Sequence, residues 1–389
     1  MPAPLRFRPP RLAIPPTVRW MLLRAFGPPG AIFPGELPAV NSLILTCRDF
    51  EMASRIMARQ RRERLTAELG EEAAASFAKF RLIDLGSGMR LMETAREAAR
   101  AASAHRIPLA LLKFAALEAT GLLPSGGRGA CDVDLLAPAD RAEELWELLR
   151  TLRFRGAGRR RLEHQFPPLL SPHAGGVVEV HRHLPGVRVA GRASADFAAL
   201  ERQGLLRPLA DFPDGVLAPI PEVLAAHVLV HGLAQHGYWP RSYPLLKMVA
   251  DLSDLRALSG RAIAWTSRDV SAGEAGAVRR LVERLAAGED PLGWEGPEEV
   301  LLRHIVAGQL DAGYARSLKL GLFRPQPSDF PRPVQLARTL LGSVFLDREQ
   351  IDAIYGRPTH PLGYVGRRLA RPFDLLGRLG AYGWARLRR

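Results

Sequence analysis

Cysteine, lysine and long apolar runs are scarce in this chain. Only two of its 389 residues are cysteine, Cys47 and Cys131, and two thiols exclude a disulfide framework and a zinc site built from several cysteines. No apolar run reaches the ~18 residues that indicate a membrane span. Residues 1–16 hold no apolar stretch that ends in a cleavage site, so we expect no secretory signal. The expectation is a cytoplasmic protein, with a composition typical of bacteria.

Lysine supplies only four of the 54 basic residues, and the others are arginine. The formal net charge is +14. A basic surface attracts phosphate-bearing partners, but the arginines are spread along the chain and such a bias often reflects genome composition. The charge is therefore weak evidence for nucleic acid. The sequence also lacks a Walker-type phosphate loop, a dinucleotide fingerprint and a serine nucleophile elbow, which argues against the enzyme classes that carry them.

Changes in composition and in hydrophobic periodicity along the chain predict four segments. Residues 1–36 are rich in proline and glycine and suggest a loosely ordered leader with one helical turn near Val18–Phe26. Residues 37–105 have helical periodicity, residues 106–216 alternate short strands with helices, and residues 217–389 are helical with a basic tail. This order predicts an α+β fold: a small mixed sheet packed on helices, flanked by N-terminal helices and a helical C-terminal domain.

Three strands are expected in the sheet, at residues 107–112, 132–137 and 177–183. Helices are expected between them at residues 114–121 and 138–152. Further helices are expected in the C-terminal domain at residues 221–235, 244–258, 274–287, 298–320 and 333–345.

The tail at residues 367–389 alternates arginine with Leu, Phe and Trp. This pattern fits a packed terminal helix with a solvated basic face. It also fits a basic amphipathic helix that meets a membrane surface or RNA.

Two aspartates, Asp132 and Asp134, alternate with a valine in the second strand, so their side chains lie on one face. Like charges so close resist ionisation unless a cation compensates them. Carboxylate oxygens suit Mg²⁺ or Mn²⁺. Glu179 lies in a strand otherwise built of valine, where an unpaired carboxylate is costly. These three carboxylates are therefore the predicted metal ligands and catalytic residues.

The residues around these carboxylates resemble the uncharacterised nucleotidyltransferases of the DNA polymerase β superfamily. The matching residues are Leu112-Lys113-Phe114, Arg128, Asp132-Val133-Asp134-Leu135-Leu136, Val178-Glu179-Val180-His181 and, before the last of these, His164. The resemblance covers roughly residues 80–255 and is strongest over 107–183.

The resemblance implies transfer of a nucleoside monophosphate from an NTP to an acceptor hydroxyl. Asp132, Asp134 and Glu179 would bind Mg²⁺ or Mn²⁺, and Glu179 could help to deprotonate the acceptor. Lys113 and Arg128 would contact the triphosphate. One position departs from the family, because Phe114 stands where glycine is usual. Ser125 and Gly126, in the downstream glycine-rich loop, are the substitutes expected for the missing backbone flexibility.

Two other functions stay open. With Phe114 in place of glycine, the fold could be an inactive module that binds nucleotide, RNA or protein. Glu179, His181 and His183 alternate on one strand and could instead form a mononuclear zinc or iron site.

His227 and His231 share a helix face but lack the glutamate of a zinc protease, which favours structural roles for them. His231, Arg241 and Asp251 also match recurring positions of the family loosely. The acceptor, whether small molecule, RNA or protein, and the oligomeric state are open.

Overall fold

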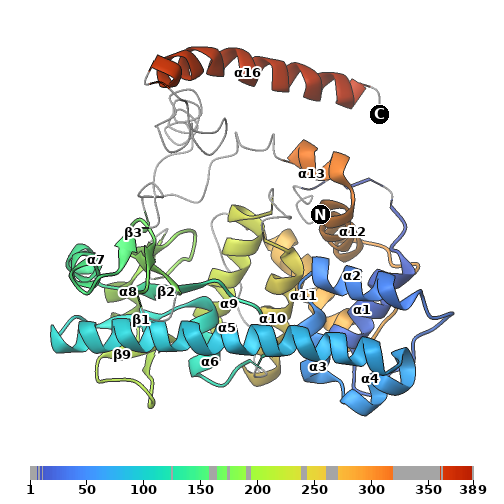
Figure 1. Ribbon diagram of the computed structural model, residues 1–389, viewed down its shortest axis with the longest axis horizontal. Coiled ribbons are helices and arrows are strands. Elements are labelled where there is room, and N and C mark those ends of the chain that lie inside the picture. Colours follow the sequence, from blue (N-terminus) through green and yellow to red (C-terminus); the bar gives the residue numbers. More distant parts are fainter. Residues whose placement is uncertain are drawn as a thin grey trace.

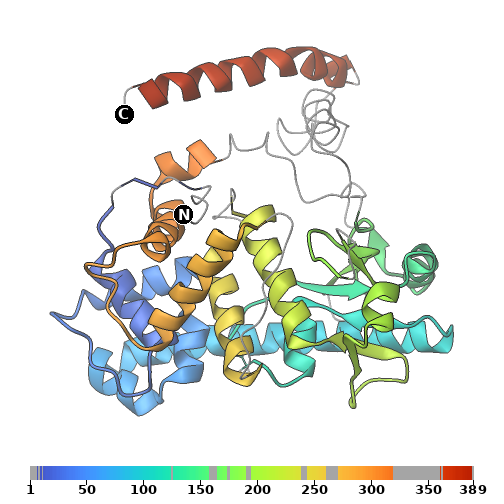
Figure 2. The same cartoon turned by 180° about the vertical axis from the view of Figure 1, so that it is seen from behind.

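The computed structural model has an α+β fold in which helices surround one main sheet (Figures 1 and 2). It describes residues 7, 9–10, 12–123, 126–156, 164–172, 176–189, 194–237, 243–259, 270–318, 360 and 362–387. The expected fold class is therefore confirmed.

Five helices precede the sheet: α1 (Pro16–Phe26), α2 (Val40–Asp49), α3 (Ala53–Arg59), α4 (Arg62–Leu69) and α5 (Glu71–Ala104). The long helix α5 runs across the lower part of the body in Figure 1 and contacts the N-terminal helices α3 and α4 as well as β2 and β5 of the sheet. Helix α1 contains the helical turn that was expected near residues 18–26 and is longer than one turn, so this part of the leader is regular structure. Its apolar residues, with Trp20 and Phe26 buried, pack it into the core.

The main sheet has the strand order β3-β4-β5-β2-β1-β9-β8. Its strands are β1 (Leu109–Leu111), β2 (Asp132–Leu136), β3 (Arg155–Gly156), β4 (Leu169–Leu170), β5 (Val177–His181), β8 (Leu206–Pro208) and β9 (Val216–Pro219). A separate small sheet pairs β6 (His183–Leu184) with β7 (Ala195–Asp196). The three expected strands form β1, β2 and β5 inside the main sheet, where β2 is parallel to β5 and antiparallel to β1.

The connecting helices are α6 (Lys113–Ala119), α7 (Ala142–Thr151) and α8 (Phe197–Arg202). The central strands bury both faces. Val133, Leu135 and Val178 join the large core that includes residues of α5 and α7, whereas Leu136 joins a smaller core on the opposite face. Because strand side chains alternate, Asp134 and Glu179 lie on the face opposite these valines.

The helices after the sheet are α9 (Pro221–Val230), the π-helix η1 (His231–Gln235), α10 (Leu245–Ser259), α11 (Ala272–Ala286), α12 (Pro297–Leu310), α13 (Ala312–Leu318) and α16 (Leu362–Leu387). The single helix expected at residues 298–320 is interrupted. Asp311 leaves helical geometry, and its carboxylate accepts hydrogen bonds from the Gly313 and Tyr314 amides, which starts α13. The helix expected at residues 333–345 lies outside the described residues. Among the described helices, none is long and apolar enough to cross a membrane.

Candidate functional site

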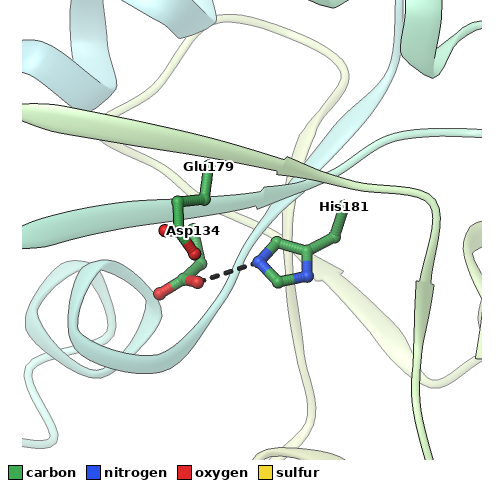
Figure 3. Close-up of side chains that lie close together, drawn as sticks. All are labelled: Asp134, Glu179 and His181. Carbon is green, nitrogen blue, oxygen red and sulfur yellow. Dashed lines mark hydrogen bonds and ion pairs between the residues drawn. The ribbon is translucent and has the colours of Figure 1, made fainter. Parts of the chain in front are cut away.

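The candidate site begins at the pairing of β2 with β5. In this parallel pair Asp134 lies directly beside Glu179, Asp132 beside Val177 and Leu136 beside His181. The register therefore brings a carboxylate of each strand together in mid-sheet. Figure 3 shows the side chains of Asp134 and Glu179 close together, with the His181 ring turned toward Asp134.

Asp134, Glu179 and His181 form a compact group of potential metal ligands. Each offers one donor atom, and these atoms lie within 4.8 Å of one another. All three side chains are buried. The Nε2 atom of His181 lies 2.9 Å from Oδ1 of Asp134, so the ring contacts this carboxylate. Glu179 instead accepts a hydrogen bond of 3.1 Å from the Gln165 amide.

Asp134 also has a buried cationic partner. The Lys113 ammonium donates to Oδ1 of Asp134 over 2.8 Å. Burial alone would raise the pKa of Asp134, but the ammonium and the His181 ring hold that pKa well below its ordinary value. Burial would likewise lower the pKa of Lys113, yet the surrounding carboxylates raise it. Asp134 is thus ionised, with an ammonium beside it.

The other two carboxylates of the site resist ionisation. Burial raises the pKa of Asp132, and the charge of Asp134 adds to that effect. Burial and Asp134 raise the pKa of Glu179 in the same way. Buried carboxylates that repel one another gain from a shared divalent cation. The donor set therefore fits a metal ion that prefers oxygen ligands, with one imidazole available in addition.

Lys113 occupies an unusual backbone position at the junction of β1 and α6. Its φ of 44° lies in the left-handed region, which side chains other than glycine rarely adopt. The next residue, Phe114, is buried, and its ring packs against Gly88 of α5, where an added Cβ would come within 3.2 Å of Phe114 Cζ. The residue in place of the usual glycine thus belongs to the packing between α5 and α6.

Arg128 is tied to the helices that follow the sheet. Its Nε donates to Oδ1 of Asp251 on α10 over 2.7 Å, and the pair is buried. Burial acts to lower the pKa of Arg128, but Asp251 raises it above its ordinary value. Gly126 has a φ of 66° and packs closely against Arg81 and Leu85 of α5. Ser125 and Arg241 lie outside the described residues.

A row of histidines leads away from the site. The rings of His164 and His227 lie 5.7 and 6.5 Å from the His181 ring, and His227 is followed by His231 at 6.3 Å. The ring centroid of His231 lies 4.4 Å from that of His236 and 5.0 Å from that of Tyr243. Burial lowers the pKa of His164 to about 3 and that of His236 to about 4. The rings of His164 and His236 are therefore neutral at physiological pH.

Glu179, His181 and His183, which could have formed a mononuclear zinc or iron site, do not lie together in one group. His181 faces Asp134 on the neighbouring strand, whereas His183 has left β5, lies in β6 and has its ring 6.2 Å from that of His164. The described potential ligand group contains His181 but not His183. The direct contacts of His181 and Lys113 with Asp134 were not expected from the sequence, because both cross between elements.

Comparison with known families agrees with this geometry. A family model described as an uncharacterised nucleotidyltransferase matches residues 41–286, from α2 to the end of α11. The match covers more than half of the chain and includes every residue of the site. No curated protein matches the chain.

Proposed function

The chain belongs to the uncharacterised nucleotidyltransferase family, and on that premise we propose that it transfers a nucleoside monophosphate from an NTP to an acceptor hydroxyl. The observation that carries this proposal is the buried pairing of Asp134 with Glu179 on adjacent strands. Asp132 projects from the same face of β2. Three carboxylates on neighbouring strands are the arrangement that metal-assisted phosphoryl chemistry needs.

Asp132, Asp134 and Glu179 are the proposed ligands for Mg²⁺ or Mn²⁺. A divalent ion held there would neutralise triphosphate charge and lower the pKa of an attacking oxygen. His181 orients the Asp134 carboxylate through its hydrogen bond. Gln165 does the same for Glu179, since it holds one oxygen of that carboxylate and leaves the other available.

Proton removal from the acceptor hydroxyl is assigned to a carboxylate of this group. A base works best when its pKa lies near the working pH. Burial and neighbouring charge raise the pKa of both Asp132 and Glu179, which moves each toward that range. Glu179 is the proposed base, in agreement with the family resemblance.

Lys113 is the proposed contact to the triphosphate. Its ammonium is already at the carboxylate group, so a short side-chain movement would bring it to a bound phosphate. Arg128 has a different role in this proposal. Its hydrogen bond to Asp251 makes it a link that fixes the loop before β2 against α10.

An inactive binding module is the second candidate function. The observation in its favour is that Lys113 and Arg128, the two cations that the family resemblance assigns to the triphosphate, are both paired with carboxylates of the protein. Such a module would bind nucleotide without turning it over. Turnover therefore separates the two candidates.

The test is transfer of label from α-³²P-labelled NTPs in an extract of the source cells. Purified full-length protein with MgCl₂ should label an acceptor, and the labelled molecule identifies it as small molecule, RNA or protein. The Asp132→Ala/Asp134→Ala variant should label nothing. A matched control is Asp140→Ala, because Asp140 is exposed in the loop after β2. Labelling that persists in the double variant would reject the proposal.

A further inference from the structure

Helix α16 exposes apolar side chains to an unusual degree. Leu362, Val365, Leu369, Phe373 and Leu376 are all exposed, with Phe373 at 75% and Leu369 at 69%. Their spacing of three or four residues places them on one side of the helix. Figures 1 and 2 both show α16 apart from the helices and sheet of the body. A contiguous exposed apolar face of this kind usually marks an interaction surface.

Arginine occupies the other side of the same helix. Arg371 stands two residues from both Leu369 and Phe373, a rotation of about 200° around the axis. It is buried and forms an ion pair of 2.7 Å with Asp374. The apolar side of this helix is therefore its exposed side.

The charge of this region is strongly one-sided. Residues 362–389 contain one acidic residue, Asp374, and seven arginines at positions 367, 368, 371, 378, 386, 388 and 389. An apolar face combined with a dense cationic charge complements a surface that offers both acyl chains and anionic headgroups. A second copy of the chain would instead bring two arginine-rich helices together, and like charges oppose that contact.

We propose that α16 binds the surface of an anionic lipid bilayer, with Leu369 and Phe373 inserted among the acyl chains and the net positive charge of residues 362–389 attracted to the anionic headgroups. The helix lies in the plane of the interface, because no described helix is apolar enough to span it. The chain would thereby act at a membrane surface.

Co-sedimentation of the full chain with vesicles tests this proposal. The chain should partition onto phosphatidylcholine vesicles that contain about 30% phosphatidylglycerol, and at least about tenfold more weakly onto pure phosphatidylcholine. Leu369→Glu/Phe373→Glu should weaken binding to the anionic vesicles by at least about tenfold. Leu369→Ala/Phe373→Ala, a milder change, should produce a smaller loss in the same direction.

The matched control is Leu82→Glu/Ile83→Glu, which places charges at two exposed apolar positions of α5 and should bind like the wild type. Equal binding by the wild type and both α16 variants would overturn the proposal. Absence of partitioning would overturn it as well, whether the wild type then binds RNA or associates with itself. The readout is independent of nucleotidyl transfer.

Discussion

Lys113 is the residue through which the site balances its charge. Its ammonium contacts Asp134 directly, and Asp132 and Glu179 also act on it electrostatically. The ammonium thus does part of what a divalent cation would do. It follows that metal binding and the position of this side chain are coupled.

Replacement of Lys113 by Met should destabilise the metal-free protein. Removal of one member of a buried ion pair leaves an uncompensated charge and costs about 3–5 kcal/mol. MgCl₂ should restore part of this loss, so it should raise the melting temperature of Lys113→Met more than that of the wild type. Lys79→Met, at an exposed position of α5, is the control. If the two variants melt alike with and without MgCl₂, Lys113 does not balance the site.

Two members of the potential ligand group, Asp134 and Glu179, were predicted together from the sequence, whereas His181, which joins them where Asp132 was expected, was considered only for a zinc or iron site. Alternation along one strand places Asp132 and Asp134 on the same face, and a glutamate among valines is conspicuous. The contact of His181 with Asp134 depends on the register between β2 and β5. A shift of two residues would keep every side chain on its face and still separate Asp134 from Glu179, and the alternation of apolar residues does not distinguish these two registers.

At the scale of helices and strands, a buried ion pair joins the N-terminal helices to α10. Arg55 of α3 donates to both carboxylate oxygens of Asp254, over 2.6 and 2.8 Å. Its Nε also donates to the Ala25 carbonyl of α1. One guanidinium therefore holds three helices together, and the two partners are almost 200 residues apart in the sequence.

Arg55→Met should lower the free energy of unfolding by about 3–5 kcal/mol, because it leaves the Asp254 carboxylate buried without its partner. The double variant Arg55→Met/Asp254→Leu should recover much of that loss, since an apolar pair needs no compensation. Urea unfolding of the single and double variants measures both effects. A double variant as unstable as Arg55→Met would contradict this role of the pair.

Elements with a long apolar pattern could be predicted, and short ones could not. Strand β1 lies in a continuous apolar run, as buried strands do, and the residues of β2 and β5 are apolar except at Asp132, Asp134, Glu179 and His181. Strands β3 and β4 have two residues each, which is too short for any periodicity. Helix α1 was expected as a single helical turn near residues 18–26, because the prolines and glycines around these mostly apolar residues concealed its full length.

On the scale of the whole molecule, buried neutral histidines make stability depend on pH. His304 of α12 is the clearest case away from the site. Its two ring nitrogens lie 2.8 Å from the Tyr314 hydroxyl and 3.0 Å from the Gly237 carbonyl, and its ring stacks on Phe7. Burial lowers the pKa of His304 to about 3.

The unfolded chain protonates such a histidine near pH 6.5, whereas the folded protein does so only near pH 3. Its contribution to stability is therefore complete above pH 6.5 and declines as the pH falls toward 3. The wild type should lose up to about 1.4 kcal/mol per pH unit more than His304→Gln in this range. Urea unfolding at pH 7, 6 and 5 measures the difference. If the free energy of unfolding falls equally with pH in the wild type and in His304→Gln, this role of His304 is wrong.

Some contacts of the site join residues that are far apart in the sequence, so they could not be predicted from it. Arg128 matches a phosphate contact by its position before Asp132, yet it pairs with Asp251, more than 120 residues later. Only the packing of α10 against the sheet region creates that partner. The residue pattern of the strands predicted the carboxylates, whereas the links between helices and sheet depend on the three-dimensional packing.

The measurement that tests the central claim most directly is calorimetric titration of the full chain with MgCl₂ and then with an NTP. The wild type and Asp140→Ala should bind both saturably, whereas Asp132→Ala/Asp134→Ala should lose metal binding and at least most of its nucleotide affinity. Equal binding of Mg²⁺ and NTP by the wild type and the double variant would contradict a metal-dependent nucleotidyltransferase site at these aspartates.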